Sequence, residues 1–498
     1  MAQGMKAEEL KALRGRLVSN ALTEDDRIAL TVILDNHLLL DQAVEEKSTT
    51  IRKLLRMIFG ATTEKARVVN MPLKPQGKKT RGHGRRSAAA YSGGGKVVLR
   101  AALTRGDRCP ECRKGRLYPT ASGTVVRITG SAPLAATSFE LEKLRCNLCG
   151  EVFTPELPGD EKKYDAAAGA MISLLKYGSG LPFNRLAQLQ EAMGIPLPAS
   201  TQWDIVERCA DRIHPVYREL IGQAAQGNLI HNDDTTMKIL ASVNEGERSG
   251  TFTTGMLSVT GEGKIALFFT GHRHAGENIT EVLAKRHAGL APPIQMCDAL
   301  SRNTSKEFAV MLAHCLAHAR RNFVDVAQSF PEDCRHVIEV LGEVYKNDAD
   351  AGGMSPEERL ASHQTRSAPL MNELHEWMTA QCEEKKVEPN SGLGKAFAYM
   401  LKHWEPLTLF VRVPGAPLDN NVCERALKMA IRHRHNSLFY RTLHGACIGD
   451  IFMSLIHTCR LSKVNPFDYL VALQKHSTEV FKNPHKWLPW NYETAGSA

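Results

Sequence analysis

The stretch NLIHNDDTTMKIL, which runs from Asn228 to Leu240, decides the fold that we expect for this 498-residue chain. Its apolar and β-branched residues favour a strand, and the segments that follow continue this pattern. These segments are GTFTTGMLSV (250–259), KIALFFTGH (264–272), a short helical piece near Glu277–Leu283 and PPIQMCDAL (292–300). The order predicts three consecutive strands, a helix and another strand.

Aspartates mark the first and the fourth of these strands. Asp233 and Asp234 lie in the first, and Asp298 ends the fourth. Three antiparallel strands followed by a crossover to a parallel neighbour are how a ribonuclease-H-like α/β sheet begins, and acids on its first and fourth strands meet at one edge. Side chains alternate across a strand, so only one of the tandem aspartates points at the site. We assign Asp233 to the site and expect Asp234 to face away or to support it from behind.

A later stretch, LDNNVCERALKMAIRHRHN from Leu418 to Asn436, is the candidate source of a third acid. Asp419 and the two asparagines after it have the chemistry of a helix N-cap. The following helix has a polar face formed by Asn421, Glu424 and Lys428, flanked by Arg425 and Arg432. Taken alone, this pattern favours a solvated helix with a Glu424–Lys428 ion pair. The strand order reverses that interpretation, because Asp233 and Asp298 need a third carboxylate from a later helix and Glu424 is the candidate.

Asp233, Asp298 and Glu424 would form a carboxylate cluster that suits Mg²⁺ (or Mn²⁺), a hard cation that prefers oxygen ligands. Two such ions activate the attacking oxygen and stabilise the leaving oxygen in phosphodiester chemistry. Helical stretches are predicted at 305–330, including CLAHARRNF, where the pattern favours a structural His318, with a contact to the site or to a phosphate as the alternative. The expected phosphate-facing surface consists of Arg320, Arg321, Arg425, Lys428, Arg432 and Arg434, with Asn421 as a contact to metal-bound water or phosphate.

Two CxxC pairs predict a zinc ribbon within residues 99–160. They are Cys109-Pro-Glu-Cys112 and Cys146-Asn-Leu-Cys149, the second followed by a glycine. Two residues between the thiolates allow a tight turn to point both sulfurs at one ion, and four thiolates complete a tetrahedral Zn²⁺ site without a free position. The site is therefore expected to be structural. Thr124–Ile128 and Phe139–Leu144 are the predicted strands of the ribbon.

The segments before the ribbon carry weaker patterns. Residues 1–66 are predicted to be helical, and the apolar spacing of 22–60 fits equally a short coiled coil between two copies and a helix packed on its own domain. Residues 67–98 are a basic, flexible linker. Its core KKTRGHGRR favours a solvated tether, with DNA minor-groove contacts from Arg81, Arg85 and Arg86 as the alternative.

Residues 161–227 read as a helical region with a helix, glycine turn, helix pattern from Arg185 to Ile213. Gly194 is expected to end the first helix, and Ser200 or Thr201 to cap the second. The pattern fits a DNA-binding helix-turn-helix and an ordinary helical hairpin equally well. In the DNA-binding interpretation, the contacts available in the second helix are Gln202 and Arg208.

The composition is that of a globular, mildly basic protein. The net charge of +9 and the pI of about 8.9 permit a polyanionic partner. The first residues lack the apolar core of a signal peptide, and we expect no membrane-spanning segment, because no run of 18 apolar residues exists. The eight cysteines outside the CxxC pairs are scattered, which favours a reducing, cytoplasmic setting over a disulfide scaffold.

Ordered blocks along nearly the whole chain closely resemble the bacterial DDE transposases of the insertion-sequence 66 family. The blocks are GHGRRSAAAYSG, CPEC with RCNLCGEVF, KYGSGLPFNRL, HNDDTTMKIL, QMCDALSRN, CLAHARRNF, EPNSGLGKAFAYMLKHW, PLDNNVCERALK, NPFDYL and LPWNY. The resemblance implies a zipper-like start, a zinc-binding domain, a ribonuclease-H-like catalytic domain over 228–450 with a helical insertion at about 331–410, and a helical segment over 451–498. The implied catalytic acids fall on Asp233, Asp298 and Glu424.

The resemblance also implies an activity and partners. The enzyme would bind the terminal inverted repeats of an insertion sequence, cleave DNA strands and transfer the 3′ ends into target DNA. It would act as a homodimer or higher assembly on DNA, in the bacterial cytoplasm at the nucleoid, with small accessory proteins of the same element. The alternatives are an inactive or domesticated zinc-ribbon DNA-binding regulator and, more weakly, another ribonuclease-H-like nuclease.

Overall fold

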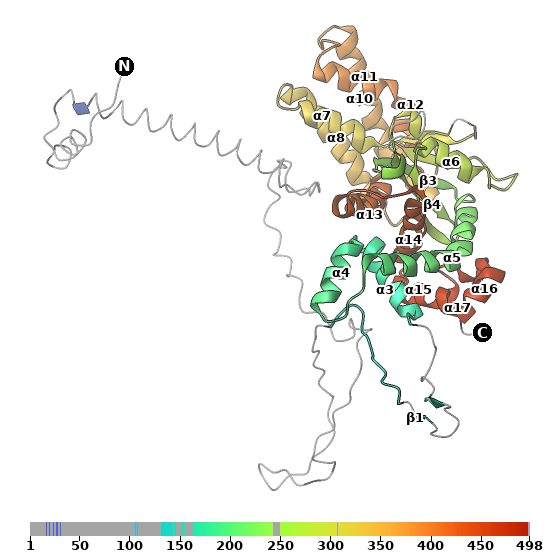
Figure 1. The fold of residues 1–498 in the computed structure, drawn as a ribbon. Helices are drawn as coiled ribbons and strands as arrows, with labels where there is room; N and C mark the ends of the chain where they lie inside the picture. The colour runs from blue at the N-terminus through green and yellow to red at the C-terminus, as the bar shows by residue number, and fades with distance from the viewer. Residues whose placement is uncertain are drawn as a thin grey trace. The chain divides into compact units, whose positions relative to one another are not determined.

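A computed structural model describes residues 131–142, 163–242, 250–305 and 307–496, together with 144–145, 152–153, 155 and a few isolated positions before 108. The chain divides into Met1–Ile128 and Thr129–Ala498, and every helix and strand named below belongs to the second unit (Figure 1). Of the predicted coiled coil in 22–60 only residues 23, 26, 27 and 30 are described, and the basic linker 67–98 lies outside the described residues.

The centre of the second unit is a five-stranded mixed sheet with the strand order β5-β4-β3-β6-β7. Its strands are β3 (Leu229–Thr236), β4 (Phe252–Thr260), β5 (Gly263–Gly271), β6 (Ile294–Cys297) and β7 (Met311–His314). The first three pair antiparallel, and β6 lies parallel to β3. The predicted order of three antiparallel strands, a helix and a parallel fourth strand is therefore confirmed, and the chain is a mixed α/β protein.

The fifth strand, which lies within 305–330, is not predicted by the sequence pattern, which indicates only helical stretches there. Met311–His314 forms β7, parallel to β6, and only then does α7 (Leu316–Val326) begin. The four residues of β7 are Met, Leu, Ala and His, whose local preference is helical, and a short buried strand has no periodicity that separates it from a helix. Pairing with β6 decides the outcome, which no local pattern encodes.

Two helices cover opposite faces of the sheet at β3 and β4. Helix α6 (Ala275–Leu283) follows β5, and helix α13 (Asn421–Ser437) arrives about 150 residues later. Both helices contact β3 and β4. The leucine Leu427 of α13 lies against Gly255 of β4, where an added Cβ would come within 2.7 Å of the leucine side chain. A glycine at this position lets the helix approach the sheet closely.

The outer edge of β5, which pairs with no further strand of the described chain, is covered by side chains of α14 (Leu443–Leu461). Asp450, Ser454 and Thr458 accept hydrogen bonds from the backbone N–H groups of residues 270, 268 and 266, respectively. Four helical residues rise about 6 Å and two strand residues about 6.7 Å, so the two repeats match. This helix therefore satisfies an edge that would otherwise present unpaired donors.

Helices from both ends of the second unit share one hydrophobic core with the sheet. The C-terminal helices lie beside α5 although they are far from it in sequence (Figure 1). The helical elements of this part are α3 (Ala166–Ser173), η2 (Leu174–Gly178), α4 (Phe183–Ala192), α5 (Ala199–Ala224), α15 (Pro466–Lys475), α16 (Ser477–Lys482), η6 (Pro484–Trp487) and α17 (Tyr492–Gly496).

The predicted helix, glycine turn, helix pattern is present as α4 and α5. Gly194 has φ of +73° just after α4, a conformation that favours glycine and ends the helix. The predicted cap is wrong, because α5 begins after Pro198 without a side-chain cap, and neither Ser200 nor Thr201 serves as one. Proline immediately before the first turn sets the extended backbone that starts the helix.

A second core lies on the side of β6 and β7 and is built from the helices that precede α13. Residues 331–410 are helical, as predicted, and contain no strand. The elements are α8 (Pro331–Asp350), α9 (Pro356–Arg366), α10 (Ala368–Glu383), α11 (Gly392–Lys402), α12 (Trp404–Leu407) and η5 (Leu409–Val411). Within the described part of the chain, no helix is both long and apolar enough to cross a membrane.

Only a small piece of the predicted zinc ribbon is described. Strands β1 (Leu144–Arg145) and β2 (Val152–Phe153) pair antiparallel, so the second CxxC pair lies in the connection between them. The four cysteines themselves and Thr124–Ile128 lie outside the described residues. The predicted strand Phe139–Leu144 is wrong over residues 139–142, which form no strand.

Two short 3-10 helices, η3 (Leu240–Ser242) and η4 (Ser301–Asn303), lie in the connections of the central sheet.

Candidate active site

Asp233 lies within β3, and Asp298 directly follows β6, the strand parallel to it. The pairing of β3 with β6 sets His231 beside Met296, and continuing that register sets Asp233 level with Asp298. Neighbouring strands are about 4.8 Å apart, and residues at the same level of a sheet direct their side chains to the same face. The register therefore brings the two predicted aspartates together.

The tandem aspartates serve opposite faces of the sheet. Asp234 accepts hydrogen bonds from the Thr254 hydroxyl (2.6 Å) and from the backbone N–H of Ala275 (3.0 Å), and it pairs with His274 (3.1 Å). Its carboxylate, only 3% exposed, is thus used to hold the start of α6. Asp233 points to the other face, where α13 lies. This division agrees with the assignment of Asp233 to the site.

Asp298 is oriented by the loop that follows it. Its Oδ1 accepts from the Asn303 side-chain amide (2.7 Å) and from the Leu300 N–H (3.2 Å). The loop is in turn held by buried amides, since Gln295 and Asn232 both donate to the Asn303 carbonyl oxygen. A buried hydrogen-bond network of this kind rigidifies the structure around it, although Asn303 Oδ1 itself has no partner among the described residues. The carboxylate of Asp298 is therefore held in place before any ligand arrives.

Glu424 reaches the site because the start of α13 is anchored by Asn420. The fully buried Asn420 side chain bonds His231 (3.0 Å) and the carbonyl oxygen of Asn232 (3.0 Å), both in β3. Its backbone N–H donates to the Cys315 sulfur (3.3 Å). The prediction that Asn420 caps the helix is wrong in this respect, because its side chain makes no cap hydrogen bond. Asn420 instead ties α13 to two distant segments, a role that the sequence pattern did not reveal.

The electrostatics of the cluster favour a bound cation. Burial raises the pKa of Asp233 to about 7, and the charges of Asp298, Asp234 and Glu424 act in the same direction, while the N–H of Asp234 opposes them. Neighbouring like charges disfavour the ionised form, and an added positive charge restores it. A cation bound beside Asp233 would therefore favour its ionised form. Oxygen-only ligands of this type suit Mg²⁺ or Mn²⁺.

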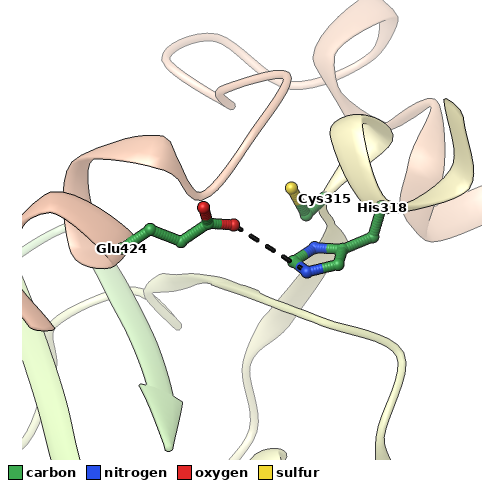
Figure 2. A group of neighbouring side chains, drawn as sticks. All are labelled: Cys315, His318 and Glu424. Carbon is green, nitrogen blue, oxygen red and sulfur yellow. Dashed lines mark ion pairs between the residues drawn. The ribbon is translucent and has the colours of Figure 1, made fainter. Parts of the chain in front are cut away.

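Cys315, just before α7, and His318, in its first turn, lie opposite Glu424. His318 Nε2 lies 3.8 Å from Glu424 Oε1, and Cys315 lies beside them, which favours a contact of His318 with the site over a structural role (Figure 2). Among the described ion pairs Glu424 pairs with His318, and the Glu424–Lys428 pair that the helix pattern alone favoured is absent. Burial raises the pKa of the Cys315 thiol to about 11, with the Asn420 N–H acting in the opposite direction. The signal for this group was the C-x-x-H spacing in CLAHARRNF.

Most of the predicted phosphate-facing residues lie near the acids on α13 and α7. Arg425, Lys428 and Arg432 are exposed along α13, and on α7 Arg321 is exposed and Arg320 half-buried. The Asn421 amide donates to Asp419 (2.6 Å). Arg434 corrects the prediction, because its guanidinium bonds Thr235 and Thr236 at the end of β3. It fastens α13 to the sheet instead of facing a ligand.

The predicted contacts in α5 separate into one exposed and one buried residue. Arg208 is exposed. Gln202 is fully buried, and its amide donates to the carbonyl oxygens of Phe183 and Leu197, so the expectation that it contacts DNA is wrong. A glutamine amide can hydrogen-bond a DNA base or a buried carbonyl group equally well. Only the packing of α4 on α5 decides between these two roles for Gln202. The predicted DNA contacts Arg81, Arg85 and Arg86 and the zinc ligands Cys109, Cys112, Cys146 and Cys149 lie outside the described residues.

Comparison with known proteins bears on this geometry. The family model described as "Transposase IS66 family" matches residues 163–447, which include the sheet, α7 and α13. "Uncharacterized protein y4hP" of Sinorhizobium fredii is 28% identical over 348 residues, 66% of this chain and 62% of that protein. "Uncharacterized protein y4jD" of the same organism is 27% identical over 343 residues, 66% of each chain. The matches thus span somewhat less than two thirds of these relatives.

Proposed function

This chain belongs to the IS66 family of transposases, and we propose that it is a metal-dependent enzyme that cuts and joins DNA at the ends of an insertion sequence. It binds the terminal inverted repeats, hydrolyses strands there to release 3′ hydroxyls, and transfers those ends into target DNA. The observation that supports the proposal is the register that sets Asp233 level with Asp298 in a five-stranded mixed sheet of ribonuclease-H-like order, where the charges of Asp298 and Glu424 both raise the pKa of Asp233.

The three carboxylates would hold Mg²⁺ or Mn²⁺, because their donor atoms are all hard oxygens and because a bound cation would favour the ionised form of Asp233. Such ions, when bound, activate the attacking oxygen and stabilise the leaving oxygen of a phosphodiester. Water is the nucleophile in the first step and leaves a 3′ hydroxyl. That hydroxyl is the nucleophile in the second step, in which one phosphodiester bond forms as another breaks.

Cations beside the acids would hold the DNA backbone. Arg425, Lys428 and Arg432 follow one another at helical spacing on the exposed side of α13, so they form a stripe that starts next to Glu424. Phosphate contacts of this kind position DNA without reading its sequence. We propose that recognition of the terminal repeats lies elsewhere, in the zinc ribbon, the basic linker and the exposed surface of α5 around Arg208.

The test is incubation of labelled terminal-repeat duplex and target plasmid with the protein and Mg²⁺. Asp298→Asn and Glu424→Gln are expected to abolish cleavage while leaving duplex binding intact. Asp325→Asn, an exposed acid on α7, is the matched control and should cut normally. Retention of cleavage by both site variants would contradict the assignment.

The same assay separates the alternatives. A transposase gives products joined to the plasmid, whereas a plain nuclease cuts without joining. A DNA-binding regulator binds the duplex but leaves it intact with and without Mg²⁺. Chelation of Mg²⁺ should stop cutting and joining but leave most of the binding.

A further inference from the structure

Cys315, His318 and Glu424 bring three metal-ligating groups of different chemistry to one place. Cys315 immediately precedes α7, His318 lies in its first turn, and Glu424 lies in the first turn of α13. One ligand atom from each residue lies within 4.8 Å of the other two. In Figure 2 the thiol and the imidazole are on one side of a gap, and the carboxylate points at them from the other.

One polar atom of this group, His318 Nδ1, is open to a ligand, because it is buried and has no hydrogen-bond partner among the described residues. Its Nε2 is 3.8 Å from Glu424, longer than a hydrogen bond. Buried polar nitrogens are usually paired, and His314, His433 and His457 also have unpaired ring nitrogens among the described residues. His318 differs from these in that its ring lies beside both a thiol and a carboxylate, so an ion held by Nδ1 would supply the missing partner.

The sulfur is prepared for a cation rather than for reaction with a substrate. Cys315 is only 1% exposed, which keeps it from acting as a nucleophile on a large molecule. Its Sγ accepts the Asn420 N–H at 3.3 Å, and a hydrogen bond of this kind supports a metal-bound thiolate. The His318 and Glu424 side chains are 28% and 31% exposed, so an ion can enter from their side.

We propose that Cys315, His318 and Glu424 form a binding site for a zinc-class transition-metal ion, Zn²⁺ or Co²⁺, in addition to the oxygen-only site for Mg²⁺. Sulfur and imidazole ligands select such ions and disfavour Mg²⁺. Metal–ligand bonds of about 2.0–2.3 Å require ligand atoms roughly 3.5 Å apart, so the group must close by about 1 Å. Three protein ligands leave a fourth position open, as in sites that bind a further molecule.

This inference rests on the geometry of the cluster and not on the proposed DNA reaction, although both use Glu424. Glu424 has two carboxylate oxygens and stands between the two sets of ligands. An ion on the Cys315 side therefore competes for, or shares, the carboxylate that the Mg²⁺ site requires.

The test is titration of the full-length protein, stripped of metal and kept reduced, with Co²⁺ in the absence of DNA. Co²⁺ bound to thiolate gives a charge-transfer absorption band, and the ribbon cysteines contribute equally in every variant. Cys315→Ser is expected to lose about one equivalent of bound Co²⁺ and its share of the band. His318→Gln, a change at a partly exposed position, should weaken that equivalent at least about tenfold.

The matched control is Cys382→Ser, which removes an exposed free cysteine of α10 and should leave the titration unchanged. Circular dichroism of each variant shows whether it folds. If Cys315→Ser does not fold, His318→Gln alone tests the proposal. An unchanged Co²⁺ stoichiometry and affinity in His318→Gln would overturn the proposal. If the wild-type protein binds Co²⁺ as expected but does not cleave DNA, the result counts against the proposed enzyme and leaves the proposed Cys315–His318–Glu424 site intact.

Discussion

At the scale of single residues, two adjacent aspartates of identical chemistry have different surroundings. Asp234 meets three donors on the α6 side, and Asp233 meets carboxylates on the α13 side. The alternation of a strand forces the two side chains apart. One acid is thus committed to structure, and its neighbour is left for a ligand.

Asp234→Ala is predicted to destabilise the fold more than Asp233→Ala. It leaves the Thr254 hydroxyl and the Ala275 N–H without their acceptor, at a cost of about 2–4 kcal/mol in the free energy of unfolding. Asp233→Ala removes a repelled carboxyl and should change stability little without metal. Urea denaturation of both variants measures the difference, with the exposed Asp325→Ala as control. Equal losses in the two site variants would contradict the division of roles.

At the scale of elements, α13 is positioned by a close fit against β4. Leu427 lies where a side chain on Gly255 would stand, and the Cys423 thiol bonds the Gly255 carbonyl oxygen (3.3 Å). Asn420 fixes the start of the same helix to β3. The helix therefore has little freedom to slide, and Glu424 is delivered to a set position.

Gly255→Ala tests this fit. The new methyl group would overlap Leu427, so α13 must move or Leu427 must change rotamer, at a cost of about 1–3 kcal/mol. We expect lower stability and slower Mg²⁺-dependent cleavage together. Gly261→Ala is the control, because a Cβ there meets no atom within 4 Å. A Gly255→Ala variant as stable and as active as wild type would show that the contact is not restrictive.

The attachment of α14 to the edge of β5 has a pH dependence. Burial raises the pKa of Asp450 to about 7, while the bonds from the Thr270 N–H and hydroxyl act in the opposite direction. The folded state therefore holds a proton that the unfolded state releases between about pH 4 and pH 7. The contribution of Asp450 to stability falls as the pH rises through that window, and it stays low above it.

Asp450→Asn is expected to remove the contribution of Asp450 to the dependence of the unfolding free energy on pH. Between pH 4.5 and pH 8, the wild type should lose on the order of 2–4 kcal/mol of unfolding free energy relative to the variant. Chemical denaturation at several pH values measures both proteins under the same conditions. If the difference between them does not change with pH, Asp450 ionises in the folded protein much as it does in the unfolded one.

At the scale of the whole molecule, the second unit is a sheet with one hydrophobic core around β3, β4 and β5 and a second core at β6 and β7. The candidate active site lies at β3 and β6, between the two cores. Segments separated by about 100 residues supply Asn420 and Cys315, which touch directly. The helices of 331–410 intervene in the chain between these contacts and pack in the second core. The chain before residue 129 forms a separate unit, and its predicted roles call for tests on the intact protein.

The predicted ribbon should bind about one Zn²⁺ per chain. Replacing both Cys109 and Cys112 with serine is expected to remove that ion, which metal analysis of the purified protein measures directly. Replacing Cys382 and Cys447, two exposed free cysteines, should leave the zinc content as it is. Purified protein without any zinc would contradict the ribbon.

The N-terminal segment has its own test. If residues 22–60 form a coiled coil between two copies, deletion of residues 1–66 should lower the oligomeric state. Light scattering coupled to size-exclusion chromatography reports the mass in solution. An unchanged mass after deletion would remove the coiled-coil interpretation and favour a helix packed within its own domain.

The sequence by itself determined the strand order, the positions of the main helices and the three candidate acids. These follow from local periodicity and turn chemistry, which act over a few residues and so can be read along the chain. The strands β3 to β6 and the helices α4, α5, α6 and α13 all lie where the pattern predicted them. Each acid alone has a common structural use, as a cap or on a solvated helix, and it was the order of the strands that selected the three together.

Only the tertiary structure decided which side chains face one another. It separated Asp233 from Asp234, buried Gln202, turned Arg434 back to the sheet, and set His318 and Cys315 opposite Glu424. It also made a strand of Met311–His314. Each outcome depends on packing between segments far apart in the chain. Local propensities of about 1 kcal/mol or less per residue cannot decide such contacts, because burial and hydrogen bonding at each of these positions contribute more.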